Sequence, residues 1–209
     1  MTTAVPIVYV VDDDPDVLKA MERLLESAGH KVAVFSSPQL FLERHDRSAA
    51  GCLVLDLQMP GLSGLDLQRT LEQQASHLPI VFLTGRGDIA ASVQAMKHGA
   101  CDFLTKPVDD DLLLATIRDA LAKEDALRPA RIERDRIQKN LATLTERERQ
   151  VLELIVAGKL NKQIAGELGT VEKTVKYHRG NLMRKMGVRV VADLVKLAER
   201  AGVGSAPKP

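Results

Sequence analysis

Three aspartates, a threonine and a lysine each follow a short apolar run in the first half of this 209-residue chain. They are Asp12, Asp13, Asp56, Thr84 and Lys106. Near-continuous apolar runs are typical of buried parallel strands, and the carboxyl ends of such strands meet at one edge of an open α/β sheet, where ligands bind. We therefore expect these five side chains to lie in one crevice.

The residue types in this crevice predict phosphoryl chemistry. Carboxylates that converge repel one another, and a divalent cation with oxygen ligands, Mg²⁺ (or Mn²⁺), relieves that repulsion. Lys106 adds a fixed positive charge. A carboxylate beside a metal ion and a lysine can attack phosphorus, because both cations neutralise the oxygens of a transferring phosphoryl group. The hydroxyl of Thr84 is suited to bind one of those oxygens.

The elements that position these residues alternate between strands and helices. Strands are predicted near residues 7–11, 31–35, 52–55, 80–83 and 102–104. Cap, proline and glycine signals bound the helices between them: Asp14-Pro15 to Gly29, a start at Ser37-Pro38, a start at Ser63, Asp88 to Gly99, and Asp109 to Lys123. The predicted fold is an α/β, CheY-like (βα)5 unit, a doubly wound parallel sheet.

The second half is predicted to be a separate all-α domain. Residues 125–143 are charge-dense and contain Pro129, which indicates a partly helical linker. Thr145 and Glu148 then form a capping box that starts a helix. Four helices are predicted near residues 146–157, 162–168, 172–186 and 190–201, and residues 204–209 form a disordered tail. The predicted divisions are therefore 1–124, 125–143, 144–203 and 204–209.

Charge and composition narrow the classes of function. Residues 1–125 hold 11 Lys and Arg against 19 Asp and Glu, a net charge of −8, whereas residues 126–209 hold 18 against 9, a net charge of +9. A basic half predicts a polyanionic partner. Mean hydropathy is −0.07, and the N-terminus lacks the basic segment of a signal peptide, so we expect a cytoplasmic protein without membrane contact. Cys52 and Cys101 are too few for a zinc site.

The third helix of the basic half, residues 172–186, has two chemically distinct faces. A rotation of about 100° per residue places Val175, Leu182 and Met186 on one face. The opposite face gathers Lys173, Lys176, Tyr177, Gly180 and Arg184. A short helix and a glycine turn precede it, which is a helix-turn-helix pattern. The alternative for such a face is solvated charge, and the +9 charge of this half favours nucleic acid.

Residues 5–122 resemble the receiver domain of two-component response regulators. The resemblance rests on VVDDDP (10–15), VLDLQMPGLSG (54–64), FLTGRGD (82–88) and GACDFLTKP (99–107). It implies that a histidine kinase phosphorylates Asp56. It also implies further roles: metal binding for Asp12, Asp13, Asp56 and the backbone carbonyl of Gln58, phosphoryl binding for Thr84 and Lys106, and an aromatic switch at Phe103.

Residues 144–188 resemble the LuxR-type DNA-binding domain, through LTERERQVL, NKQIAGELG and TVKYHRGNLMRKM. With the receiver resemblance, this implies a FixJ/NarL-type transcription factor that forms a homodimer when phosphorylated and binds double-stranded promoter DNA. The resemblance implies base contacts for Lys176, Tyr177 and Gly180, and phosphate contacts for Lys162, Lys173, Thr174, His178 and Lys185, with Arg184 on the same basic face. For His178, packing against the apolar face is an equal alternative.

Two other classes of function share parts of these patterns. Haloacid-dehalogenase-like phosphatases also form an aspartyl phosphate, but they carry a second aspartate two positions later as the general acid. That position is Gln58 here, which cannot transfer a proton, so we expect no enzymatic turnover. An RNA-binding antiterminator is disfavoured by the helix-turn-helix pattern.

Overall fold

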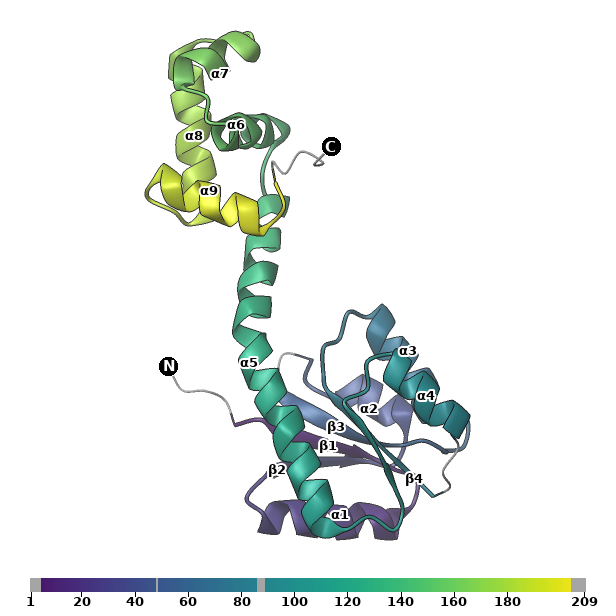
Figure 1. Ribbon diagram of the computed structural model, residues 1–209. Coiled ribbons are helices and arrows are strands. Elements are labelled where there is room, and N and C mark those ends of the chain that lie inside the picture. Colours follow the sequence, from purple (N-terminus) through teal and green to yellow (C-terminus); the bar gives the residue numbers. More distant parts are fainter. Residues whose placement is uncertain (1–4, 48, 86–88, 204–209) are drawn as a thin grey trace. The chain divides into compact units, whose positions relative to one another are not determined.

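The computed structural model describes residues 5–47, 49–85 and 89–203 (Figure 1). The chain divides into two compact units, Met1–Arg128 and Pro129–Pro209. Two expectations, the helix cap at Asp88 and the tail at 204–209, lie outside the described residues. Within the described ranges, no helix has both the length and the apolar character that crossing a membrane requires.

The first unit is built on a five-stranded parallel sheet with the order β2-β1-β3-β4-β5. The strands are β1 Ile7–Val11, β2 Lys31–Phe35, β3 Gly51–Asp56, β4 Ile80–Thr84 and β5 Asp102–Thr105. The chain runs outward from β1 to β2 and then returns to the other side of β1, so the strand order reverses between β1 and β3. This reversal creates a crevice at the carboxyl ends of the strands. The predicted (βα)5 fold is confirmed.

Helices cover both faces of the sheet (Figure 1). They are α1 Pro15–Ser27, α2 Pro38–Arg44, α3 Gly64–Gln73, α4 Ile89–Lys97 and the first part of α5 Asp110–Ala142. One buried cluster joins β-strand residues such as Val54 to Leu25 of α1 and Ile117 of α5. The other joins Phe82 of β4 to Leu67 of α3. Because successive residues of β1, β3 and β4 supply the two clusters, these strands are buried on both faces, as expected for this class.

Local capping signals fix where two of these helices begin. The Asp14 side chain accepts hydrogen bonds from the backbone N–H groups of Asp16 and Val17, which confirms it as the N-cap of α1. Ser63 and Asp66 form a reciprocal capping box at the start of α3. Helices α1 and α3 start after the loops that follow Asp12 and Asp56. These caps therefore fix where each of the two loops ends.

The structure differs from the expectation at residues 125–143, which are helical through Ala142 rather than a partly helical linker. Pro129 lies inside α5 and is the first residue of the second unit. An interior proline costs a helix about 3 kcal/mol, and two compensations are visible. Pro129 is surrounded by residue types that favour helices, namely alanine, leucine, arginine and glutamate. In addition, Ile137 and Leu141 of the same helix are buried in the core of the second unit.

The second unit contains α6 Glu146–Val156, α7 Asn161–Glu167, α8 Glu172–Met186 and α9 Val191–Arg200, together with the last part of α5. The predicted capping box of Thr145 and Glu148 is present at the start of α6. Helix α8 contacts α6, α7 and α9, and its buried residues are the predicted Val175, Leu182 and Met186. The exposed residues of α8 form part of the outer surface of this unit.

Candidate phosphoacceptor site and nucleic-acid interface

Lys106 joins two buried carboxylates at the carboxyl ends of β1 and β3. Its Nζ donates to Asp12 Oδ2 at 2.6 Å and to Asp56 Oδ1 at 2.8 Å. Asp12 is 2% exposed and Asp56 is 6% exposed. These three residues come from distant parts of the sequence, and the sheet brings them together as predicted from their positions after the strands.

The second oxygen of each carboxylate is held by the backbone of its own loop. Asp12 Oδ1 accepts the backbone N–H of Asp14 at 2.9 Å, and Asp56 Oδ2 accepts the backbone N–H of Gln58 at 3.0 Å. Every carboxylate oxygen of the pair therefore has a donor, which fixes the orientation of both side chains. Charged acceptors with such donors form stronger hydrogen bonds than neutral groups.

Burial and the hydrogen bonds within this cluster shift the pKa values of Asp56 and Lys106 in opposite directions. Burial raises the pKa of Asp56, and the nearby Asp12 raises it further, while Lys106 and the Gln58 N–H act to lower it. For Lys106, burial lowers the pKa, but the hydrogen bonds to Asp12 and Asp56 outweigh it, so the pKa lies above its ordinary value. The ammonium is thus held charged beside the carboxylate.

The other predicted members of the site lie in different environments. Asp13 is exposed, whereas Thr84, at the end of β4, is fully buried. Phe103 on β5 is half-buried, and its ring centroid lies 6.1 Å from that of Phe82. Thr84 and Phe103 lie on neighbouring strands, because β4 pairs with β5.

The donor chemistry of the site suits a hard divalent cation. Asp12, Asp13 and Asp56 offer only oxygen ligands, which Mg²⁺ and Mn²⁺ prefer. Among the described residues, no group of three or more His, Cys, Asp or Glu side chains is arranged as a metal centre. The Lys106 ammonium offsets one of the two negative charges of the buried carboxylates.

Gly64, the first residue of α3, lies against the backbone of the loop that carries Asp56. A Cβ atom at Gly64 would overlap the backbone carbonyl oxygen of Asp56 and press on Leu57. The Gly64 N–H also donates to the Leu57 carbonyl at 3.0 Å. The start of α3 therefore packs directly against the backbone of Asp56 and Leu57, and only glycine permits that approach.

Two side chains of α3 hold the end of α4, the helix after β4. The buried Gln68 amide donates to the carbonyls of Ala95 and His98, at 3.0 and 3.2 Å. Glu72 Oε2 lies 3.1 Å from His98 Nδ1. These contacts join residues 26 to 30 positions apart in the sequence, so the pattern of a single sequence does not reveal them. They anchor the carboxyl-terminal end of α4 on α3.

The outer face of α8 carries the basic residues that the helical rotation predicted. The exposed residues on this face are Lys173, Lys176, Tyr177, Gly180 and Arg184. Tyr177 is 66% exposed, which is high for an aromatic side chain without a partner surface. The face combines positive charge with an accessible ring, features that suit contact with a nucleic acid.

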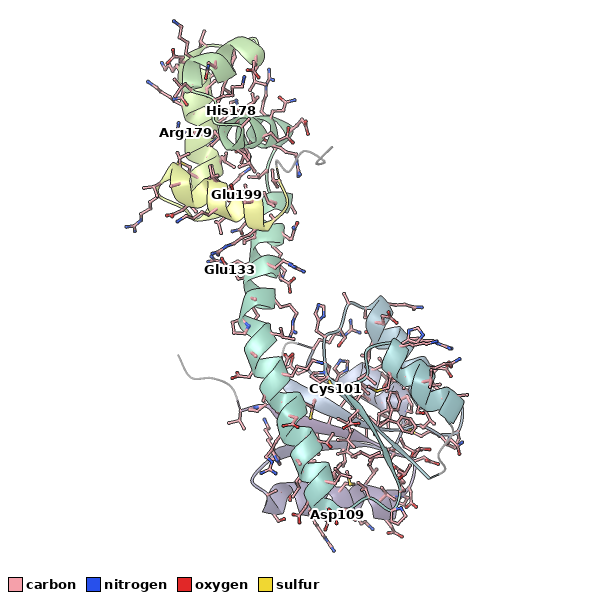
Figure 2. All side chains as sticks on the ribbon, in the orientation of Figure 1. Cys101, Asp109, Glu133, His178, Arg179 and Glu199 are labelled. Atoms are coloured by element: carbon pink, nitrogen blue, oxygen red, sulfur yellow. The ribbon has the colours of Figure 1, made fainter. Side chains whose placement is uncertain are left out.

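The residues around this face differ in accessibility. Lys162 on α7 is exposed, whereas Thr174 and His178 are half-buried, and the His178 ring packs against the Tyr177 ring at 5.5 Å. Figure 2 shows His178 and Arg179 on α8. The sequence did not single out Arg179, whose Nη1 donates to Asn161 Oδ1 at 3.0 Å and so ties α8 to α7.

Lys185, for which a phosphate contact is expected, also has partners inside the second unit. Its Nζ donates to Glu148 Oε2 at 2.6 Å and to the Thr143 carbonyl at 2.9 Å. Glu148 is 3% exposed, and its carboxylate also accepts the Thr145 backbone N–H at 2.8 Å. Burial raises the pKa of Glu148, but Lys185 and Thr145 outweigh it, so its pKa lies below the ordinary value.

Replacement of Glu148 by alanine is expected to lower the free energy of unfolding by about 3 kcal/mol, because it leaves Lys185 without its carboxylate and removes the Glu148 half of the capping box. The pKa of Glu148 is lower in the folded state than in the unfolded state. This stabilisation is therefore fully present at pH values above the unfolded-state pKa, and it is lost as the pH falls through the folded-state pKa. Urea denaturation measures the effect. The exposed Glu153→Ala variant of the same helix should change stability by less than about 0.5 kcal/mol, and an equal loss in both variants would contradict the role of the ion pair.

Comparison with known proteins assigns a family to each unit. Residues 8–118 match the response regulator receiver domain, and residues 142–198 match the LuxR family of bacterial regulatory proteins. The site around Asp56 lies in the first match, and α8 lies in the second.

Relatives match across nearly the whole chain. The response regulator protein TodT of Pseudomonas putida F1 is 45% identical over 200 residues, which cover 96% of this chain and 88% of TodT. The transcriptional regulatory protein FixJ of Bradyrhizobium diazoefficiens is 42% identical over 197 residues, 94% of this chain and 96% of FixJ. The structure of the response regulator StyR aligns with a TM-score of 0.78 at 47% identity, covering 94% of this chain and all of that one. The chain therefore belongs to the two-component response regulators that join a receiver domain to a LuxR-type DNA-binding domain, and it is a transcriptional regulator of that family.

Proposed function

We propose that phosphorylation of Asp56 switches this regulator into a dimer that binds promoter DNA. The observation that carries the proposal is the Asp12–Lys106–Asp56 cluster, a buried carboxylate held against a fixed cation, in a chain that also presents the basic face of α8. A histidine kinase is the proposed phosphoryl donor. Residues 1–124 are the proposed receiver, and residues 144–203 are the proposed DNA-binding domain.

The chain's own residues account for the proposed transfer. The Asp56 carboxylate forms the new bond to phosphorus while the bond to the donor nitrogen breaks. Lys106 already donates to Asp56 and neutralises charge on the incoming phosphoryl oxygens. Asp12, Asp13, Asp56 and the Gln58 carbonyl would hold Mg²⁺ or Mn²⁺, which supplies further charge neutralisation when bound.

The switch is proposed to follow from the burial of Thr84 and the position of Phe103. A phosphoryl group adds negative charge and acceptor oxygens at Asp56, and these attract Lys106 and the Thr84 hydroxyl. Movement of Thr84 opens space beside β4, into which the half-buried Phe103 turns. The surface of α4 and β5 then changes and becomes the dimer contact. Phe103 therefore links the chemistry at Asp56 to dimer formation.

An enzyme with turnover is the weaker candidate. The residue two positions after Asp56 is Gln58, whose backbone N–H, rather than an acidic side chain, faces the carboxylate. Glutamine cannot act as the general acid and base that rapid hydrolysis of an aspartyl phosphate needs. We therefore propose a regulator without enzymatic turnover, which acts in the cytoplasm, where its kinase and DNA partners meet it.

Two lysine variants test the proposed DNA interface. Lys176→Ala should reduce discrimination between a selected duplex and random duplex by about 1–3 kcal/mol, because a side chain that contacts a base edge carries sequence information. Lys162→Ala should weaken both duplexes alike, because a phosphate contact carries none. Fluorescence anisotropy at two salt concentrations measures both effects. Identical behaviour of the two variants on both duplexes would contradict these roles.

A further inference from the structure

Gly180 occupies a position in α8 where the fold itself does not require glycine. It lies in the interior of the helix, eight residues after the first residue, Glu172, and it is exposed. A Cβ atom at Gly180 would meet nothing within 4 Å, and its backbone does not have the positive φ that favours glycine. An alanine would therefore fit the helix without steric conflict.

Glycine at such a position weakens the helix. It gives the unfolded chain more conformational freedom than alanine does, so an interior glycine is among the least favourable residues in a helix. Gly64 shows the opposite case in this chain, because a Cβ there would overlap the Asp56 carbonyl oxygen. Internal packing thus explains Gly64 and leaves Gly180 without an explanation inside the domain.

The surroundings of Gly180 indicate an explanation outside the domain. Tyr177 precedes it by one helical turn on the exposed face, and Arg184 follows it by one turn. Together with Lys176, these long side chains surround a point that has no side chain. A helix is about 10–12 Å wide with its side chains, and the major groove of B-DNA is about 12 Å wide. Because the fit is close, a single side chain that points at the base edges changes how deeply the helix can enter the groove.

We propose that Gly180 is the point of closest approach between α8 and duplex DNA, and that it sets the depth at which the helix lies in the major groove. The inference rests on the proposed DNA-binding function and adds a specificity determinant to it. The missing side chain lets the backbone of α8 approach the base edges, while Lys176 and Tyr177 on one side and Arg184 on the other reach around it. The helix gives up stability at Gly180 in exchange for this approach.

The test uses two substitutions in the full-length protein and a matched glycine control. Gly180→Ala adds one methyl group, and Gly180→Gln adds a longer side chain. Gly166→Ala is the control, because Gly166 is also exposed, helical and open, but it lies near the end of α7 and outside the basic face of α8. The probes are a duplex selected from a random pool by the wild-type protein and an unselected duplex of equal length.

Stability and binding should change in opposite directions. Gly180→Ala should raise the melting temperature of the DNA-binding domain by about 4–8 °C, since that unit is small. The same variant should bind the selected duplex about tenfold more weakly, and Gly180→Gln about a hundredfold more weakly, because added volume at a close contact is costly. The unselected duplex should lose less affinity, since phosphate contacts dominate it. Gly166→Ala should bind both duplexes as the wild type does.

Two results would overturn the inference while leaving DNA binding intact. One is a Gly180→Ala protein that binds the selected duplex as tightly as the wild type does. The other is an equal loss of affinity in Gly166→Ala, which would show that helix stiffness rather than close approach matters. If the wild-type protein binds no duplex at all, the proposed function fails, and the inference about Gly180 fails with it.

Discussion

Asp56→Asn is expected to abolish phosphoryl labelling of the protein, both by a histidine kinase and by acetyl phosphate. Asparagine cannot form the acyl phosphate, and no other buried carboxylate takes the same place, because Asp12 remains bound to Lys106 and to its own loop. The measurement is incorporation of radiolabelled phosphate, and the expected loss is complete. EDTA should suppress labelling of the wild-type protein in the same way, since the oxygen ligands of the site suit a divalent cation.

Two features of the structure make this variant informative. The Lys106 ammonium keeps its 2.6 Å contact with Asp12, so the substitution leaves no unpaired buried cation and the domain should stay folded. Asp16→Asn is a matched control, because Asp16 lies four residues after Asp12 and its side chain is 91% exposed. Labelling that persists in Asp56→Asn, or that EDTA leaves undiminished, would refute Asp56 as the metal-dependent phosphoacceptor.

The second large effect is expected in the oligomeric state. Beryllofluoride, which mimics the phosphoryl group, should convert the protein from monomer to dimer, because the group at Asp56 attracts Thr84 and Lys106 and allows Phe103 to turn inward. Sedimentation velocity measures the conversion directly. Phe103→Ala should bind the mimic and yet dimerise weakly, whereas Asp56→Asn should do neither.

The same experiment can contradict the proposed switch in two ways. Wild-type protein that stays monomeric with the mimic bound would show that phosphorylation does not create a dimer surface. Full dimerisation of Phe103→Ala would show that the half-buried ring is not the link between the phosphoacceptor and the dimer surface.

Local rules predicted much of this fold from the sequence. The Asp14 cap, the Thr145 and Glu148 capping box and the two faces of α8 depend on residues within one or a few turns, so their patterns can be read from a single sequence. Strand ends could be predicted for the same reason, and they located Asp56 and Lys106 at one edge of the sheet.

The exact pairing of distant side chains carried no such signal, even where strand ends placed the residues at one edge of the sheet. Lys106 bridges Asp12 across 94 positions, and Lys185 reaches Glu148 across 37. A surface lysine and a lysine in an ion pair look alike in sequence, so the pairing of Lys185 with Glu148 was not predicted. Pro129 misled in a similar way, because burial of Ile137 and Leu141 outweighs the local cost of a proline inside α5.

The central claim, that phosphorylation of Asp56 controls DNA binding, is tested most directly by one titration. A labelled duplex selected by the wild-type protein is titrated with full-length wild-type and Asp56→Asn protein, each with and without acetyl phosphate and Mg²⁺. Two recognition helices in one dimer bind paired half-sites with avidity, so phosphorylation should raise the affinity of the wild type by about 100-fold or more and leave Asp56→Asn unchanged. Equal affinity of the wild type in both conditions, or an equal gain in Asp56→Asn, would contradict the claim.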